Sequence, residues 1–401
     1  MAENKDKKVL NVPNIRFPEF KEEWKKCRFD KVATGFDYGM NAAAKAFDGE
    51  NKYIRITDID EGLSIYNDSD VVSPDGVLSD NYLVKERDIL LARTGASTGK
   101  SYLYRKTDGK LYYAGFLIRA NITDHSPYFV FAQLHTHRYW KWISTMSARS
   151  GQPGINSQEY ASFPISTTSI QEENKIATFL SLLDERIATQ NKIIEELECL
   201  KKEITKRLFS QKANKYNRLD SLFIKGKAGG TPTSTNKEYY NGNIPFLSIN
   251  DITTQGKYIY YTEKYITQKG LDNSSAWIVP KGCLIISMYA SVGLVAINCI
   301  PISTSQAMFS IQLKDENLID YLYYYLSYFR YRHIHKYLET GTQSNINADI
   351  VRSILIPDYG YDMNIKIANS IKSIDDKIKN EVLILNQYTF QKQHLLRQMF
   401  I

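Results

Sequence analysis

Residues 176–208 read IATFLSLLDERIATQNKIIEELECLKKEITKRL, and residues 367–399 read IANSIKSIDDKIKNEVLILNQYTFQKQHLLRQM. Apolar residues in both segments recur at steps that alternate between three and four, a spacing typical of a coiled-coil seam. The predicted seam residues are Ile176, Leu180, Leu183, Ile187, Ile194, Leu197, Ile204 and Leu208 in the first segment, and Ile367, Ile371, Ile374, Ile378, Leu385, Tyr388, Leu395 and Met399 in the second.

The two segments also share their irregularities. Every seam pair is related by a constant shift of 191, since 367 − 176 = 191 and 399 − 208 = 191. At the same shift, Gln190 matches Glu381 and Lys201 matches Lys392, so the polar interruptions recur as well. Unrelated heptads would not share their defects, and the chain is therefore predicted to be an internal duplication.

The repeat continues outside the helices. YIRITDID (53–60) matches FLSINDIT (246–253) at a shift of 193, and LVKERDILLARTGASTG (83–99) matches WIVPKGCLIISMYASVG (277–293) at a shift of 194. GQPGIN (151–156) matches TQSNIN (342–347) at a shift of 191. We expect helical stretches at 128–146 and 319–338, and short strands at 163–165 and 354–356.

This order predicts an α+β fold with two homologous domains of mixed or antiparallel sheet and helices. The expected boundaries are 1–168 for the first domain, 169–212 for the first long helix, 213–360 for the second domain and 361–401 for the second long helix. Because a compact domain usually returns its chain ends close together, the helices should be antiparallel. Each would span roughly 60 Å. The domains would then lie at opposite ends of a rod, related by a pseudo-two-fold axis, although heptads of this length often form only a structural helix pair.

Composition sets broad limits on the protein's class. The chain has 401 residues, 43% of them hydrophobic, and a net charge of +7 with a pI near 8.9, which is compatible with a polyanionic partner. Its cysteines, Cys27, Cys199, Cys283 and Cys299, show no CxxC spacing and are expected to be free thiols. No signal peptide is expected, and the uncharged stretch 282–313 has a charged counterpart in the first half. We expect a soluble, cytoplasmic protein.

Motifs for catalysis are lacking. GGTP at 229–232 has no Walker lysine, and no GxGxxG follows a strand. The pairs His135/His137 and His333/His335 do not coincide under the repeat, so packing or solvated histidines are favoured over metal ligands. Asp58 and Asp251 recur but stand alone, which favours turn capping. We predict no catalytic residue, no metal site and no cofactor in this chain.

Loops at strand ends carry side chains of the kinds that reach base edges and phosphates. For any one such loop taken alone, an ordinary polar surface is the favoured interpretation. The DNA-binding candidates are Arg93, Thr94, Ser97, Thr98, Lys100, Arg149, Ser150, Gln152 and Asn156 in the first half, and Lys227, Thr231, Thr233, Ser234, Asn236, Ser287, Tyr289, Ser291, Gln343, Ser344, Asn345 and Asn347 in the second.

The repeat divides these candidates into two classes. Gln152 and Asn156 match Gln343 and Asn347, which indicates a retained structural or phosphate-positioning role. Arg93 aligned with Ser287, and Thr94 aligned with Met288, differ between the halves and are better candidates for reading sequence. The two halves would then read different sequences.

Taken together, these segments resemble the specificity subunit of a type I restriction–modification enzyme over essentially the whole chain. The resemblance rests on GGTPTSTNKEYYNGNIPFLSINDIT (229–253), GCLIISMYASVG (282–293) and TQSNIN, and on FDYGMNAAAKAFDGENKYIRITDI (36–59), DILLARTGASTGK (88–100) and RFPEFKEEW (16–24). The first half has Asn41 to Ala44 where the second has GGTP, so the role of that loop carries over only to the second half.

The resemblance implies two target-recognition domains, each reading one half of a bipartite, asymmetric site in double-stranded DNA. The paired helices would set the spacer and dock two modification (methyltransferase) subunits. The complex would use S-adenosylmethionine to methylate adenine, and its restriction (motor–nuclease) subunits would use ATP and Mg. Two alternatives stay open: the detached specificity module of a fused methyltransferase–nuclease, and a coiled-coil scaffold that binds protein.

Overall fold

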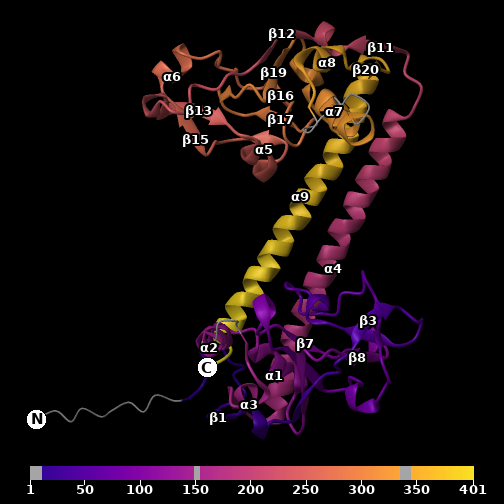
Figure 1. The fold of residues 1–401 in the computed structure, drawn as a ribbon, viewed down its shortest axis with the longest axis vertical. Coiled ribbons are helices and arrows are strands. Elements are labelled where there is room, and N and C mark those ends of the chain that lie inside the picture. The colour runs from indigo at the N-terminus through magenta and orange to yellow at the C-terminus, as the bar shows by residue number, and fades with distance from the viewer. Residues whose placement is uncertain (1–10, 149–153, 335–344) are drawn as a thin grey trace, which may run out of the picture. The chain divides into compact units, whose positions relative to one another are not determined.

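The computed structural model describes residues 11–148, 154–334 and 345–401 (Figure 1). Contacts divide the chain into two units. Unit 1 comprises Met1–Ile193 with Val382–Ile401, and unit 2 comprises Ile194–Glu381. The division therefore falls inside both long helices, so each unit holds a globular part and a portion of each helix, whereas the predicted boundaries set the helices apart.

Unit 1 contains a four-stranded antiparallel sheet in the order β2-β9-β6-β7. Three pairs accompany it: β1–β10 and β3–β5 are antiparallel, and β4–β8 is parallel. The elements are β1 (Lys25–Arg28), β2 (Ala33–Tyr38), β3 (Ala43–Ala46), β4 (Lys52–Ile54), β5 (Val72–Asp75), β6 (Asp88–Ala92), β7 (Ser101–Leu103), β8 (Leu111–Tyr113), β9 (Leu117–Ile122), α1 (Pro127–Gln133), α2 (His137–Ser147), α3 (Ser157–Ala161), β10 (Pro164–Thr167) and the first part of α4 (Ile170–Phe209).

Unit 2 contains a five-stranded sheet in the order β12-β19-β16-β17-β14 and a three-stranded sheet in the order β15-β13-β18. Strands β11 and β20 form an antiparallel pair. The elements are β11 (Lys215–Arg218), β12 (Phe223–Ala228), β13 (Tyr240–Leu247), α5 (Ile249–Gln255), β14 (Tyr258–Ile259), β15 (Lys264–Ile266), α6 (Gln268–Asp272), β16 (Leu284–Ser287), β17 (Val295–Asn298), β18 (Ser303–Thr304), β19 (Met308–Leu313), α7 (Ile319–Arg332), α8 (Ala348–Ser353), β20 (Leu355–Asp358) and the first part of α9 (Tyr361–Gln398).

The two units repeat one another strand by strand. The order β2-β9-β6-β7 in unit 1 corresponds to β12-β19-β16-β17 in unit 2. The pair β1–β10 corresponds to β11–β20, and the parallel pair β4–β8 corresponds to the parallel pair β13–β18. The predicted fold class, two homologous α+β domains with two long helices, is confirmed.

One local expectation was wrong, and two short helices were not foreseen. The predicted helix 128–146 is interrupted at Leu134–Thr136 and forms α1 and α2, because the Thr136 side chain caps α2 by accepting a hydrogen bond from Tyr139 N. Sequence reasoning also missed the short helices α3 and α8, which precede β10 and β20. Helix α7 ends at Arg332, and residues 335–338 of the predicted helix lie outside the described residues.

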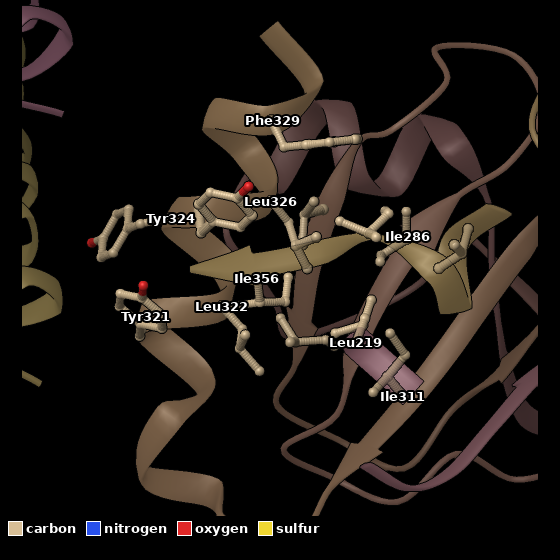
Figure 2. Packing of buried hydrophobic residues seen from close by; sticks show 14 of the residues in the cluster. Leu219, Ile286, Ile311, Tyr321, Leu322, Tyr324, Leu326, Phe329 and Ile356 are labelled. Carbon is tan, nitrogen blue, oxygen red and sulfur yellow. The ribbon is translucent and has the colours of Figure 1, made fainter. Parts of the chain in front are cut away.

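The main core of unit 2 packs α7 against its larger sheet (Figure 2). Leu322 and Leu326 of α7 share a cluster with Ile286 of β16 and Ile311 of β19, and each is at most 3% exposed. Full burial of one such side chain contributes about 2 kcal/mol. The corresponding cluster of unit 1 packs Val130 of α1 against the β6 and β9 side chains of its sheet.

Within each unit, the portions of α4 and α9 run antiparallel. In unit 1 the beginning of α4 clusters with the end of α9 through Ile176, Leu180 and Met399. In unit 2 the end of α4 and the beginning of α9 share a cluster through Phe209 and Ile367. All sixteen predicted seam residues are buried or partly buried, and none is exposed.

Candidate nucleic-acid interface

A shared backbone frame carries the loop that follows the central strand of each sheet. In unit 1, Arg93 N donates to Phe116 O (3.1 Å) and Arg93 O accepts from Ile155 N (2.9 Å). In unit 2, Met288 N donates to Ala307 O (2.7 Å) and Met288 O accepts from Ile346 N (3.1 Å). Phe116 and Ala307, and likewise Ile155 and Ile346, are related by the same constant shift as the seam residues of the long helices. Arg93 and Met288 are therefore structural equivalents.

This equivalence corrects the predicted alignment of Arg93 with Ser287 and of Thr94 with Met288. Ser287 corresponds to Ala92 instead, because Gly99 N donates to Ala92 O and Gly293 N donates to Ser287 O. The first loop is one residue longer than the second, so a constant shift of 194 misplaces its first residues. The inference that this position differs between the halves still holds.

The GGTP loop has a counterpart in unit 1 at Gly39–Ala42, where the predicted counterpart was Asn41 to Ala44. Gly39 N donates to Leu117 O and Gly229 N donates to Met308 O, and the seam shift also relates these two acceptors. A Cβ at Gly39 would lie 2.2 Å from Ala114 O, and one at Gly229 would lie 2.0 Å from Thr304 O. Both positions require glycine because a neighbouring backbone passes at contact distance.

In unit 1, Arg93 lies over an aromatic ring at the edge of a pocket of about 620 Å³. Its guanidinium carbon is 4.7 Å from the centroid of the Tyr38 ring, and the exposed Phe116 also lines this pocket. Burial raises the pKa of Tyr38, but the hydrogen bond from Ser157 N and the positive charge of Arg93 lower it below its usual value overall. Sequence reasoning missed Tyr38 and Phe116.

The other DNA-binding candidates of the loop after β6 are less accessible to a ligand. Thr98 is buried and donates through Oγ1 to Gly95 O (2.8 Å). Lys100 forms an ion pair with Glu61 (2.7 Å). Thr94 and Ser97 are partly buried, and Thr94 forms a β-bridge with Gly154. Arg93 is thus the cation that this loop presents to the pocket.

In unit 2, four of the DNA-binding candidates in and around the GGTP loop are exposed. Lys227, Thr231, Thr233 and Ser234 are solvent-exposed, and Thr231 Oγ1 donates to Gln306 Oε1. Asn236 has a local role, because its side chain accepts from Glu238 N and caps a short 3₁₀ helix (Lys237–Tyr239).

The loop after β16 presents Tyr289 and Ser291 to solvent. Ala290 and Ser291 have positive φ values of 41° and 47°, which L residues adopt at a cost of roughly 1 kcal/mol each. Ser287 supports this strained turn: it is fully buried, and its Oγ donates to Ser291 O and accepts from Leu294 N. Because the Ser287 side chain is in the interior, it supports the loop and does not lie on a surface that DNA could contact.

Asn156 and Asn347 occupy equivalent helix N-caps. Asn156 Oδ1 accepts from Glu159 N (2.9 Å) at α3, and Asn347 Oδ1 accepts from Ile350 N (2.9 Å) at α8. Helix capping therefore accounts for their repetition. Asn345 is half-buried. The remaining candidates, Arg149, Ser150, Gln152, Gln343 and Ser344, lie outside the described residues.

The recurrent aspartates have the capping role that the sequence indicated. Asp58 accepts from Arg55 N, and Asp251 accepts from Ser248 N, each at the third position of a short helix. His135 lies between α1 and α2, where its imidazole contacts Phe131 O and Ser64 Oγ; burial lowers its pKa to about 4. Across residues 11–148, 154–334 and 345–401, no cluster of His, Cys, Asp or Glu has the geometry of a metal site.

A buried acidic pair anchors the start of α4. Glu172 accepts from Arg16 Nε (2.7 Å) and from Thr168 Oγ1 (2.5 Å). Glu173 accepts from Ser126 N (3.0 Å) and lies 2.8 Å from His125 Nδ1. The hydrogen bond to Glu173 raises the pKa of His125, against the opposing effect of burial.

In the described part of the chain, no helix has the length and apolar character needed to cross a bilayer.

Known proteins match this chain in sequence and in fold. The model of the type I restriction modification DNA specificity domain matches residues 21–199 and again residues 212–387. A segment of 159 residues is 31% identical to the type I restriction enzyme MjaIX specificity subunit of Methanocaldococcus jannaschii, covering 38% of this chain and 36% of that relative. The alignment thus spans about a third of the relative's length.

Two solved structures share the fold over nearly the whole chain. One is the S subunit of a type I restriction-modification system from M. genitalium, with a TM-score of 0.63 and 15% identity, covering 97% of this chain and 99% of that one. The other comes from a study of complex assembly and conformational transition of the type I R-M system, with a TM-score of 0.59 and 14% identity, covering 94% and 97%. With two matched copies of the domain model covering most of its length, the chain belongs to the type I restriction modification DNA specificity family.

Proposed function

We propose that this protein is the DNA-reading subunit of a type I restriction–modification complex, in which unit 1 and unit 2 each read one half of a bipartite, asymmetric target. The observation that carries this proposal is the pair Arg93 and Met288. Identical backbone hydrogen bonds hold these residues in the two units, while their side chains differ in charge and shape. A duplicated frame with unlike side chains suits recognition of two unlike half-sites.

The helices α4 and α9 would set the spacer between half-sites and dock two methyltransferase subunits. The duplication supports two partners, because a repeated scaffold offers the same surface twice. The complex would also contain restriction subunits and would use S-adenosylmethionine, ATP and Mg. This chain would contribute recognition and assembly without catalytic residues.

The net charge of this chain supports a model in which the other subunits of the complex supply much of the affinity for DNA. A net charge of +7 spread over 401 residues gives weak non-specific attraction to phosphates. Base contacts worth roughly 1–3 kcal/mol each would supply discrimination. We expect weak, salt-sensitive DNA binding by the isolated chain and tight, specific binding by the complex.

Methylome sequencing of cells that express this chain with methyltransferase and restriction subunits tests the proposal. The expected result is adenine methylation in a single bipartite motif with two unlike halves and a fixed spacer. A protein-binding scaffold would produce no sequence motif. A module detached from a fused methyltransferase–nuclease would be active only beside the catalytic region of that enzyme, so methylation with separate type I subunits distinguishes the two.

A further inference from the structure

Three side chains distant in sequence converge at one end of the unit 1 sheet: Tyr38 at the end of β2, Arg93 after β6 and Phe116 before β9. The Arg93 guanidinium lies over the Tyr38 ring at 4.7 Å, and its Nη1 is 3.4 Å from Gly115 O. All three residues line the same pocket of about 620 Å³.

The cluster is held in place by backbone hydrogen bonds. The Tyr38 hydroxyl accepts from Ser157 N (3.2 Å) at the first turn of α3, which fixes the far end of the ring. Arg93 N donates to Phe116 O, so the backbones beneath the Arg93 and Phe116 side chains are joined directly. A guanidinium already placed on an aromatic face loses less conformational freedom when it binds a planar partner.

The cluster also combines charge with exposed aromatic surface. Tyr38 is 40% exposed and Phe116 is 59% exposed. Arg55, a second cation of the pocket, is paired with Asp58 (2.8 Å) and Asp70 (3.1 Å). Among the residues that the structure describes, no carboxylate lies within ion-pair distance of Arg93. Its charge is therefore available to a ligand.

Unit 2 shows that the fold does not require this cluster. The residues equivalent to Tyr38, Arg93 and Phe116 are Ala228, Met288 and Ala307, as the matched hydrogen bonds at Gly39/Gly229 and Arg93/Met288 establish. The same frame thus forms with two alanines and a buried methionine. A purely structural role for the stacked arginine would have a counterpart in unit 2, and none of the three side chains has one.

We propose that Tyr38, Arg93 and Phe116 form the base-reading element of unit 1 and that Arg93 recognises a guanine of its half-site. This inference rests on the proposed function. Arg93 would donate two hydrogen bonds to guanine O6 and N7, the pairing that arginine geometry favours in the major groove. Tyr38 acts as a positioning residue that holds the guanidinium plane, and Phe116 contacts the neighbouring base. Unit 2, with Met288 there, does not read a guanine by this contact.

The test is the base preference of the reconstituted complex with methyltransferase subunits, measured by selection from DNA with randomised half-sites. The wild-type complex is expected to select guanine at one position of one half-site. Arg93→Met, which installs the unit 2 residue, should reduce that preference by roughly 5- to 150-fold and leave the other half-site unchanged. Arg93→Lys should lose the preference yet keep salt-dependent affinity, because lysine keeps the charge without the bidentate fork.

Two further variants separate positioning from bulk structure. Tyr38→Ala should weaken the guanine preference, whereas Tyr38→Phe, which keeps the ring, should retain most of it. Arg28→Ala removes an exposed arginine of the same unit that pairs with Asp30, and should change neither half-site.

The outcomes distinguish the inference from the proposed function. An unchanged guanine preference in Arg93→Met, or equal loss at both half-sites, overturns the assignment of this cluster. A wild-type complex that selects no bipartite sequence overturns the proposed function itself. Retention of the remaining bases of the unit 1 half-site in every variant shows that unit 1 has folded.

Discussion

Lys201 Nζ of α4 lies 2.5 Å from Asp375 Oδ1 of α9 in unit 2, and an ion pair at the equivalent positions of the internal repeat is present in unit 1. There, Lys392 Nζ lies 2.5 Å from Asp184 Oδ1. Both lysines occupy seam positions, where a polar residue costs stability but specifies the register of a coiled coil. Each aspartate also accepts a tyrosine hydroxyl, from Tyr324 (2.7 Å) in unit 2 and from Tyr128 in unit 1.

Charge reversal at Lys392 should destabilise unit 1. In Lys392→Asp, two carboxylates would face each other at a site where Lys392 is 16% and Asp184 is 23% exposed. We expect the free energy of unfolding to fall by about 1–3 kcal/mol, a loss between those typical of breaking exposed and buried ion pairs. Thermal unfolding followed by circular dichroism measures it.

The double variant Lys392→Asp/Asp184→Lys restores opposite charges and should recover much of the lost stability. Lys379→Asp reverses an exposed charge on the same helix and is the matched control. Equal destabilisation by Lys379→Asp, or no recovery in the double variant, would show that this ion pair does not stabilise unit 1.

Substitution of the loop glycines should be costly in both units. In Gly39→Ala and Gly229→Ala, the new Cβ would meet a backbone oxygen at 2.2 Å and 2.0 Å, so a strand must move. Such overpacking costs typically about 1–3 kcal/mol. Urea denaturation measures the change. Gly62→Ala is the control, because its Cβ would meet only Asp60 Oδ1 at 3.5 Å, and a similar loss there would contradict the explanation.

The His125–Glu173 contact should make the stability of unit 1 depend on pH. The hydrogen bond to Glu173 raises the pKa of His125 above 6.5 in the folded state. A group with a raised folded pKa stabilises the fold fully below its unfolded pKa, and that contribution is lost as pH rises through the folded value. The melting temperature of the wild type should therefore fall relative to that of His125→Gln as pH rises from 6 upward. Parallel pH profiles for the two proteins would refute this.

Helix length should determine the spacer of the DNA target. One heptad added to both α4 and α9 at equivalent places lengthens each by about 10 Å, or roughly 3 base pairs at 3.4 Å per base pair. Methylome sequencing of cells with the lengthened variant should show a changed spacer and unchanged half-sites. Altered half-site bases would contradict a spacing role for the helices.

The architecture could be predicted because the duplication is visible in the spacing of apolar residues along the sequence. The heptads of the two segments recur at one constant shift, and Lys201 and Lys392 interrupt them at equivalent positions. This pattern predicts both long helices and shows that the second repeats the first. Capping by Asp58 and Asp251 was also predictable, because an Asx side chain bonds to backbone only a few residues away.

The base-reading element of unit 1 was only partly predictable. Arg93 could be identified because its chemistry differs between the repeats. Its contact with Tyr38 joins the ends of two strands that are far apart in sequence, and its equivalence to Met288 depends on hydrogen bonds to Phe116 and Ile155. A one-residue difference in loop length, invisible to a constant shift, moved the aligned residue from Met288 to Ser287.

The matched hydrogen bonds at N and O of Arg93 and of Met288 join main-chain atoms alone, and this has a consequence for the protein's history. Under the proposed function, substitution of the Arg93 side chain would alter what unit 1 recognises and leave these main-chain hydrogen bonds in place. A new target for one copy would then need only a few codon changes and would leave its twin unaltered.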